Sequence, residues 1–279
     1  MVGLKFMGAT EDFTTTIDVG AFSGYTDKRV VELATEALKM LGACIGNARA
    51  VAKDRESSPP LEILLGLSLL VFAEFQALLM LCTAGLERPA RIHMRSVCEY
   101  KVRADLLLGD KNKADEFIFA AAAELEYLGA LISADSKDID AAKIRFLGAT
   151  GSPEQSKREK NVLGGDMRTI LKNSSGDKAY GASFAWPSAF SHGSILALGE
   201  VSRSLENSGP NFQNPLLRDG GGFGYINTAV SVSCHFTSLL VKHFRVAVSS
   251  QLADVLQRQA ALAAEVGPAN PHTTAKPTL

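Results

Sequence analysis

The sequence is poor in several features that mark common classes of protein. Aromatic residues make up 7% of its 279 residues, tryptophan occurs once, and the formal net charge is −1. So small a charge gives no broad electrostatic attraction to nucleic acid or to an anionic membrane. The 46% hydrophobic content excludes an intrinsically disordered chain and a collagen, and it predicts a soluble globular protein with a sizeable core.

The chain also lacks the usual cysteine and catalytic motifs. The four cysteines are far apart, each within an apolar run: Cys44, Cys82, Cys98 and Cys234. Without a C-x-x-C pair, they predict buried, reduced thiols in a cytosolic protein and not a disulfide scaffold. No G-x-S-x-G motif occurs, and no carboxylate completes a metal set near His235 and His243. We therefore expect no hydrolase elbow, no metal and no other cofactor.

Membrane and export segments are not expected either. Residues 1–13 hold one lysine and no long apolar run, so they do not predict a secretory signal. Residues 61–81 are apolar and long enough to cross a bilayer. However, Glu74 and Gln76 lie inside this run, and a carboxylate in hydrocarbon costs about 2.5–3.5 kcal/mol. A central helix covered on all sides by other helices explains the same run, and we favour that interpretation over a membrane span.

Apolar periodicity and chain breakers predict an all-α fold, an antiparallel helical bundle. Helices are expected from an N-cap at Thr26 to about Lys53, from Pro59 to near Gly85, from Pro89 to about Leu108, from Lys113 to Ile132, and from about Phe223 to Val248, with a continuation to Ala264 left open. Residues 1–25 are expected to be an irregular arm, and residues 26–265 the bundle, with a polar helical insert at about 133–175. Residues 266–279 are expected to be a disordered tail. Residues 228–236 alternate in polarity, so a strand there is the main local alternative.

The third expected helix carries the strongest chemical signal. At about 100° per residue, Arg91, Arg95 and Glu99 fall on one side of it, which continues into an apolar seam. Arg95 and Glu99 are four residues apart and can meet directly. Charges that face a bundle interior must be paired, so one interpretation is an ion pair that fixes the helix register. The other is a polar functional site inside the bundle, because clustered charged groups also mark active sites.

His192 is a second candidate, in an apolar setting beside Ser188 and Ser191. A histidine there can be a general acid or base, although a core histidine bonded to a carbonyl is the common alternative. Arg88 and His93 match the R-x4-H spacing of some helical ribonucleases, but a five-residue offset turns the two side chains about 140° apart on a helix.

Two further patterns have simpler interpretations. The glycine-rich turn at residues 220–224 could cradle a phosphate at a helix N-terminus, but a flexible loop is the default. Polar residues at heptad spacing predict a solvated helix face, or else the wall of a groove: Thr228, Ser231, His235, Ser238 and Lys242.

Four short motifs, in order, resemble an uncharacterised bacterial family classed only as a domain of unknown function. They are Gly85 at the end of an apolar helix, the R-S-x-x-E of Arg95 to Glu99, the helix end at Leu107 to Asp110, and the S-x-x-x-H of Ser188 to His192. The resemblance spans roughly residues 60–245. That family is similar to HEPN helical domains, many of which are metal-independent ribonucleases in toxin and phage-defence systems. HEPN enzymes carry their arginine and histidine on one helix, whereas Arg95 and His192 lie on different segments.

The resemblance implies an RNA-cleaving protein of the bacterial cytoplasm. Arg95 would stabilise the phosphate charge, Glu99 would orient Arg95, and His192 would act as acid or base. The candidate substrate-binding residues are Arg91, Ser188 and Ser191. A homodimer is also implied, because HEPN-like bundles commonly pair. The alternative is a non-enzymatic helical module that binds a partner protein or a small ligand between its helices, which the near-neutral charge favours.

Overall fold

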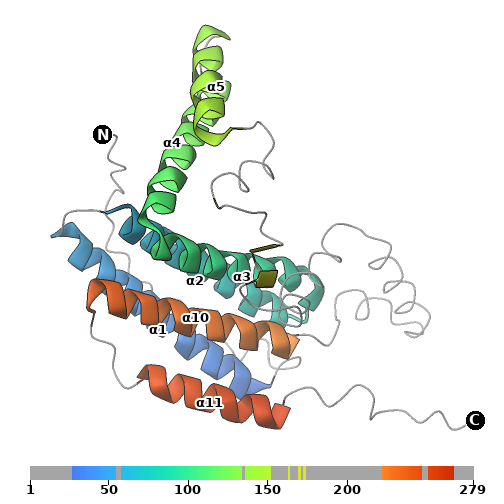
Figure 1. The fold of residues 1–279 in the computed structure, drawn as a ribbon. Helices are drawn as coiled ribbons and strands as arrows, with labels where there is room; N and C mark the ends of the chain where they lie inside the picture. The colour runs from blue at the N-terminus through green and yellow to red at the C-terminus, as the bar shows by residue number, and fades with distance from the viewer. Residues whose placement is uncertain are drawn as a thin grey trace, which may run out of the picture.

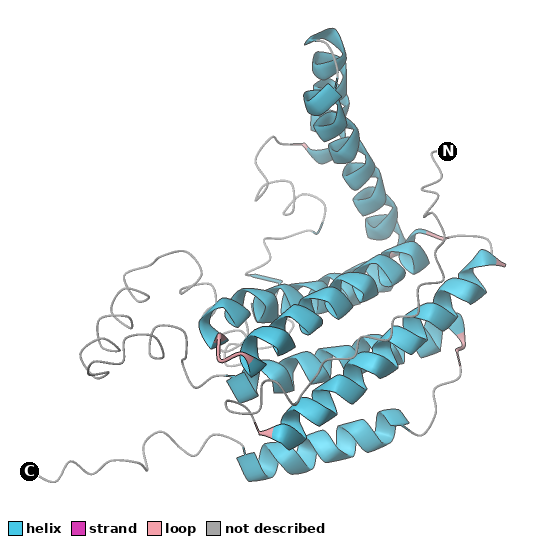
Figure 2. Ribbon diagram, turned by 180° about the vertical axis from the view of Figure 1, so that it is seen from behind, coloured by secondary structure: helices cyan, strands magenta, loops and turns pink. Residues whose placement is uncertain are grey.

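The computed structural model describes residues 27–54, 58–133, 136–151, 163, 169–170, 172–173, 222–246 and 251–266. These residues contain helices α1 (Lys28–Lys53), α2 (Pro59–Thr83), α3 (Glu87–Gly109), α4 (Lys111–Ser133), α5 (Ser136–Thr150), α10 (Gly222–Phe244) and α11 (Gln251–Val266). No strand occurs among the described residues (Figure 2). The predicted all-α class is confirmed.

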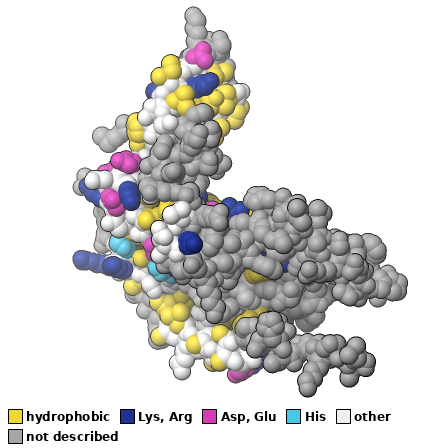
Figure 3. Space-filling model, turned by 45° about the vertical axis from the view of Figure 1, so that its right-hand side comes forward, with side chains coloured by type: hydrophobic (Ala, Val, Ile, Leu, Met, Phe, Trp, Pro, Cys, Tyr) yellow, Lys and Arg dark blue, Asp and Glu magenta, His cyan; other side chains and the backbone are white. Residues whose placement is uncertain are grey.

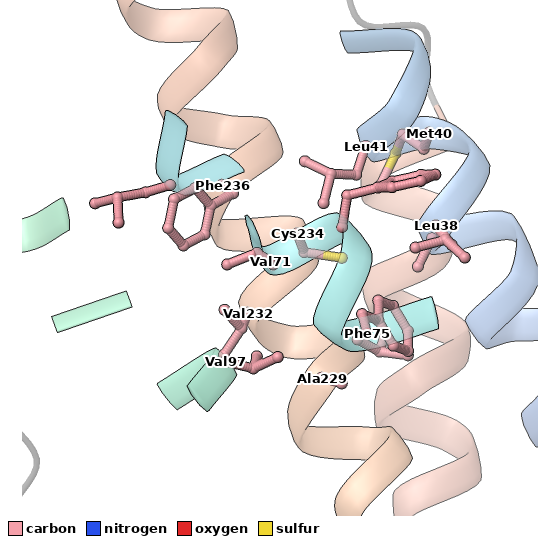
Figure 4. Packing of buried hydrophobic residues seen from close by; sticks show 14 of the residues in the cluster. Leu38, Met40, Leu41, Val71, Phe75, Val97, Ala229, Val232, Cys234 and Phe236 are labelled. Carbon is pink, nitrogen blue, oxygen red and sulfur yellow. The ribbon is translucent and has the colours of Figure 1, made fainter. Parts of the chain in front are cut away.

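Four helices, α1, α2, α3 and α10, surround one hydrophobic core. Their apolar side chains meet between them, among them Leu41 of α1, Phe75 of α2, Val97 of α3 and Phe236 of α10 (Figure 4). Helix α11 packs along α1 and α10 (Figure 1). The amphipathic sequence pattern thus produces a bundle, because each apolar stripe is covered by neighbouring helices.

Helix α2 is the apolar segment whose membrane character was in question. Among the described helices, it alone is long and apolar enough to cross a bilayer, a test that the core helix of a soluble protein also passes. It packs against α1, α3, α4 and α10, and Leu64, Phe75 and Leu79 have no exposed surface. One side of α2 is thus packed as in a core helix, but Leu70 and Met80 are 46% and 50% exposed, so the expectation that other helices cover it on all sides is not met. The packing is compatible with a soluble protein.

The ends of α1 and α2 follow the capping signals closely. Asp27, not Thr26, is the N-cap of α1, and its Oδ1 accepts a hydrogen bond from the Arg29 amide at 2.9 Å. Gly85 follows α2 with a left-handed φ of 76°. The amides of Gly85 and Leu86 donate back to the carbonyls of Cys82 and Leu81, at 3.1 and 2.7 Å. These two bonds form a Schellman motif, so the prediction that Gly85 ends this helix is confirmed.

Helices α3 and α4 are separated by Asp110 alone. Its Oδ1 accepts hydrogen bonds from the amides of Asn112 and Lys113, at 3.0 and 3.3 Å, and so caps α4. Helix α4 then leaves the bundle and α5 returns along it, so the two form a projecting α4–α5 hairpin (Figure 1). The insert expected at about 133–175 contains α5, and most of its other residues lie outside the described part of the chain.

The last long helix, expected from about Phe223 to Val248, is confirmed as α10 (Gly222–Phe244), but the continuation to Ala264 that was left open does not occur as one helix. Helix α10 ends at Phe244, and the next residue, Arg245, has a φ of 55° that no continuing helix allows. The chain resumes as α11 at Gln251. The alternative of a strand at residues 228–236 is also wrong, because this segment lies inside α10.

The prediction that the cysteines are buried and form no disulfide is confirmed. All four thiols are free and buried. Burial raises the pKa of the Cys44 thiol, and it raises that of Cys234 to about 11. The expected N-terminal arm (residues 1–25) and the tail beyond residue 266 lie outside the described residues.

Candidate functional site

The candidate site begins with a charged face on α3. Arg95 Nε donates to Glu99 Oε1 at 2.8 Å, and Arg103 Nη2 lies 3.6 Å from Glu99 Oε2. One carboxylate therefore bridges two guanidinium groups, each one helical turn away. The three side chains are only 27%, 16% and 17% exposed for Arg95, Glu99 and Arg103. The prediction that Arg95 and Glu99 meet directly is confirmed.

Arg88 lies on the same side of α3, two turns before Arg95, and it is also partly buried. We call Arg88, Arg95, Glu99 and Arg103 the arginine face. Three arginines and one glutamate give it a formal charge of +2. A guanidinium presents several N–H donors in a planar fork that matches carboxylate and phosphate oxygens, so a group of partly buried arginines is suited to an anionic group.

Arg91 lies deeper than the arginine face. It is 2% exposed, the largest fully buried side chain of the described residues, and its Nε donates to Tyr225 Oη at 2.9 Å. Tyr225, 8% exposed, belongs to α10. The contact links two helices that are 134 residues apart in the sequence. Arg91 was expected to bind substrate, and the structure places it in the contact between α3 and α10.

The glycine-rich turn meets α3 at the same end of the bundle. Gly222 is the first residue of α10, and a Cβ added there would lie 2.8 Å from Glu87 Oε1. Glu87 is itself buried, at 4% exposure. A side chain at residue 222 would therefore displace the Glu87 carboxylate, whose charge is favoured near the positive end of the helix dipole. The Glu87 carboxylate lies against the first residue of α10, and its negative charge disfavours a phosphate there.

His93 points away from the arginine face, as its helical position predicts. Its Nδ1 lies 2.5 Å from Glu74 Oε2 of α2. Between this pair and the arginine face lies Tyr100, whose ring is 5.9 Å from the Arg103 Cζ. Burial raises the pKa of the Tyr100 hydroxyl, and the charge of Glu74 raises it further. Arg88 and His93 therefore do not form one R-x4-H site.

A second polar cluster joins α3 to the stripe on α10. His235 Nε2 lies 2.7 Å from Asp105 Oδ1, and Lys101 Nζ donates to Asp105 Oδ2 at 2.7 Å. Burial raises the pKa of Asp105, but the hydrogen bonds from His235 and Lys101 outweigh it, so that the pKa lies below its usual value. Ser231 of the same stripe accepts a bond from Gln259 of α11 at 2.6 Å. The stripe is a surface face that is bonded to its neighbours on both sides.

Three of the candidate residues, Ser188, Ser191 and His192, lie outside the described residues. The structure therefore brings together Arg95 and Glu99, sets Arg91 beneath them, and leaves the other three as predictions. Within the described ranges, no group of three or more histidine, cysteine, aspartate or glutamate side chains could hold a metal ion.

Sequence reasoning missed Arg103 and Tyr225. Arg103 could have been found, because it follows Glu99 by four residues in the order that stabilises a helix best. Tyr225 carried no local signal, since its partner is distant in the sequence.

No family model, no curated protein and no solved structure matches this chain. The resemblance to HEPN-like domains rests on the sequence motifs alone.

Proposed function

We propose that this chain is a HEPN-like, metal-independent ribonuclease and that its arginine face binds the phosphate backbone of RNA. The supporting observation is the Arg95–Glu99–Arg103 arrangement, where two guanidinium groups are held by one carboxylate on a partly buried face of charge +2. A guanidinium held in this way is oriented before substrate arrives, which is how donors stabilise charge that develops during a reaction.

The proposed chemistry is an internal phosphoryl transfer. The 2′-hydroxyl oxygen of a ribose forms a bond to the adjacent phosphorus, and the bond from phosphorus to the 5′-oxygen breaks. Arg95 stabilises the added negative charge, and Glu99 fixes the Arg95 side chain. His192 takes the proton of the 2′-hydroxyl or delivers one to the 5′-oxygen, with solvent carrying the other. The products are a 2′,3′-cyclic phosphate and a 5′-hydroxyl, and the reaction requires no metal.

The remaining candidate residues have supporting roles in this proposal. Ser188 and Ser191 bind the RNA beside His192. Arg91, bonded to Tyr225 within the core, holds α3 against α10 and supports the arginine face from beneath. The setting we propose is the bacterial cytoplasm, in toxin or phage defence. Free, buried cysteines are compatible with a reducing compartment.

A specific observation favours a second candidate, a non-enzymatic helical module that binds a partner protein or a small ligand. Glu99 contacts both Arg95 and Arg103, as a purely structural ion-pair network would. The net charge of −1 also lacks the broad basic field common in RNA-binding proteins.

Expression in bacteria separates the two functions. We would compare the wild type, His192→Ala, and Arg258→Ala, whose arginine lies on α11 in ion pairs with Glu36 and Asp254. A ribonuclease arrests growth and fragments cellular RNA in the wild type and in Arg258→Ala, but not in His192→Ala. Equal growth with intact RNA in all three strains contradicts the ribonuclease and favours the binding module.

A further inference from the structure

One side of α4 carries an apolar stripe with alternating spacings of four and three residues. Its members are Ala114, Ile118, Ala121, Leu125, Leu128 and Ile132. This is the spacing of the a and d positions of a heptad, which keeps side chains on one side of a helix. Helix α5 packs against a different side of α4, where Tyr127 stacks on Phe146 with ring centroids 5.1 Å apart.

The stripe has a covered half and an exposed half. Ala114 is fully buried, and Ile118 packs against the core of the bundle. From Ala121 onward the stripe is exposed, with Leu125, Leu128 and Ile132 at 62%, 47% and 88%. This half lies where the hairpin projects beyond the bundle (Figure 1), and hydrophobic side chains gather over the hairpin in Figure 3. We call Ala121, Leu125, Leu128 and Ile132 the outer α4 stripe.

We propose that the outer α4 stripe binds the same stripe of a second copy of this chain, as an antiparallel coiled coil. A twofold axis between Leu125 and Leu128 places each of these leucines opposite the other in the partner. The same axis places the small Ala121 opposite the partner's Ile132, which is the most exposed member. The stripe is therefore complementary in shape to itself, as a twofold contact between identical chains requires.

The length of the exposed half fits this register. The overlap runs from residue 121 to residue 132 in both copies. Before Ala121, Ile118 already belongs to the core of its own bundle, and after Ile132 helix α4 ends at Ser133. The two bundles then lie at opposite ends of the contact and do not collide.

The charged residues of the overlap, Glu124 and Glu126, lie beside the stripe and not in it. The outer α4 stripe carries no charged residue. Glu126, exposed on the same helix, is already bonded to Arg145 of its own α5. The overlap of residues 121–132 is smaller than the roughly 20–30 residues that each side of a standard interface contributes. We therefore expect a reversible dimer whose population rises with protein concentration.

Sedimentation equilibrium over a range from low to high micromolar protein tests the proposal. The wild type is expected to shift from monomer to dimer, and Leu125→Glu is expected to raise the dissociation constant at least tenfold. The matched control is Phe119→Glu, which adds the same charge at a side chain that is 66% exposed on α4 but off the stripe. A wild type that stays monomeric, or an equal effect of both variants, overturns the proposal.

Cysteine cross-linking tests the antiparallel register independently, since the four native thiols are buried. The double variant Ala121→Cys/Ile132→Cys is expected to form a covalent dimer under mild oxidation, whereas Ala121→Cys alone is not. Circular dichroism confirms that each variant is folded. Efficient cross-linking of Ala121→Cys alone indicates a parallel contact and overturns the register.

Discussion

Arg91 of α3 donates a hydrogen bond from Nε to Tyr225 Oη of α10 across 2.9 Å, with both side chains buried. Removing the acceptor leaves a buried cation with one bond fewer. We expect Tyr225→Phe to lower the free energy of unfolding by about 1–3 kcal/mol, because a hydrogen bond to a charged group is worth more than a neutral one. Urea denaturation measures the change, and an unaltered midpoint would show that the bond adds no stability.

The close approach of Gly222 to Glu87, at the same end of the bundle, can be tested by substitution. Gly222→Ala places a Cβ 2.8 Å from Glu87 Oε1, so the carboxylate or the helix must move. We expect a loss of about 1–3 kcal/mol, as for other overpacked sites. Gly224→Ala is the control, because nothing lies within 4 Å of its added Cβ. Inside a helix that change should stabilise by up to about 1 kcal/mol. Equal effects of the two substitutions would contradict the close approach.

Much of the bundle could be predicted from local sequence signals. The ends of α1 and α2 could be predicted to within a few residues, because residues that cap or break helices mark them. These residues are Asp27, the Ser58-Pro59-Pro60 break and Gly85. The break between α10 and α11 was left open, because Arg245 is neither glycine nor proline and nothing in its type signals a φ of 55°.

Only the contacts of the site that lie within one helix could be predicted from the sequence. Arg95 and Glu99 meet because they are four residues apart on α3. The contacts of Arg91 with Tyr225 and of Gly222 with Glu87 depend on how α10 returns to α3, and no short-range pattern encodes that. The alternation at residues 228–236 left a strand open as an alternative for a related reason, since packing against α1, α2 and α3 decides the helix.

The Asp105 carboxylate makes the free energy of unfolding depend on pH. Its folded-state pKa lies below the usual value because the bonds from His235 and Lys101 outweigh burial. A lowered pKa contributes stability that is present above the unfolded-state pKa of about 4 and is lost as the pH falls through the folded-state pKa. We expect the wild type to be more stable than Asp105→Asn near neutral pH. The two should converge on acidification, as followed by urea denaturation at each pH. A difference that stays constant down to strongly acidic pH would contradict this linkage.

The buried thiols should be unreactive in the native protein. Burial holds the pKa of Cys234 at about 11, so almost no thiolate exists at neutral pH, and all four thiols are covered. We expect a chromogenic disulfide reagent to label none of them rapidly in the folded state and all four in denaturant. Rapid labelling of a folded thiol would show that the core opens or that the thiol is accessible.

Cleavage of single-stranded RNA by purified protein in the presence of a metal chelator bears on the ribonuclease itself. We expect the wild type and Arg258→Ala to release 2′,3′-cyclic phosphate ends at equal rates. Arg95→Ala should be slower by about 10²–10³-fold, the usual cost of removing one donor that stabilises transition-state charge. Intact RNA with the folded wild type, or full activity in Arg95→Ala, would contradict the proposed role of the arginine face.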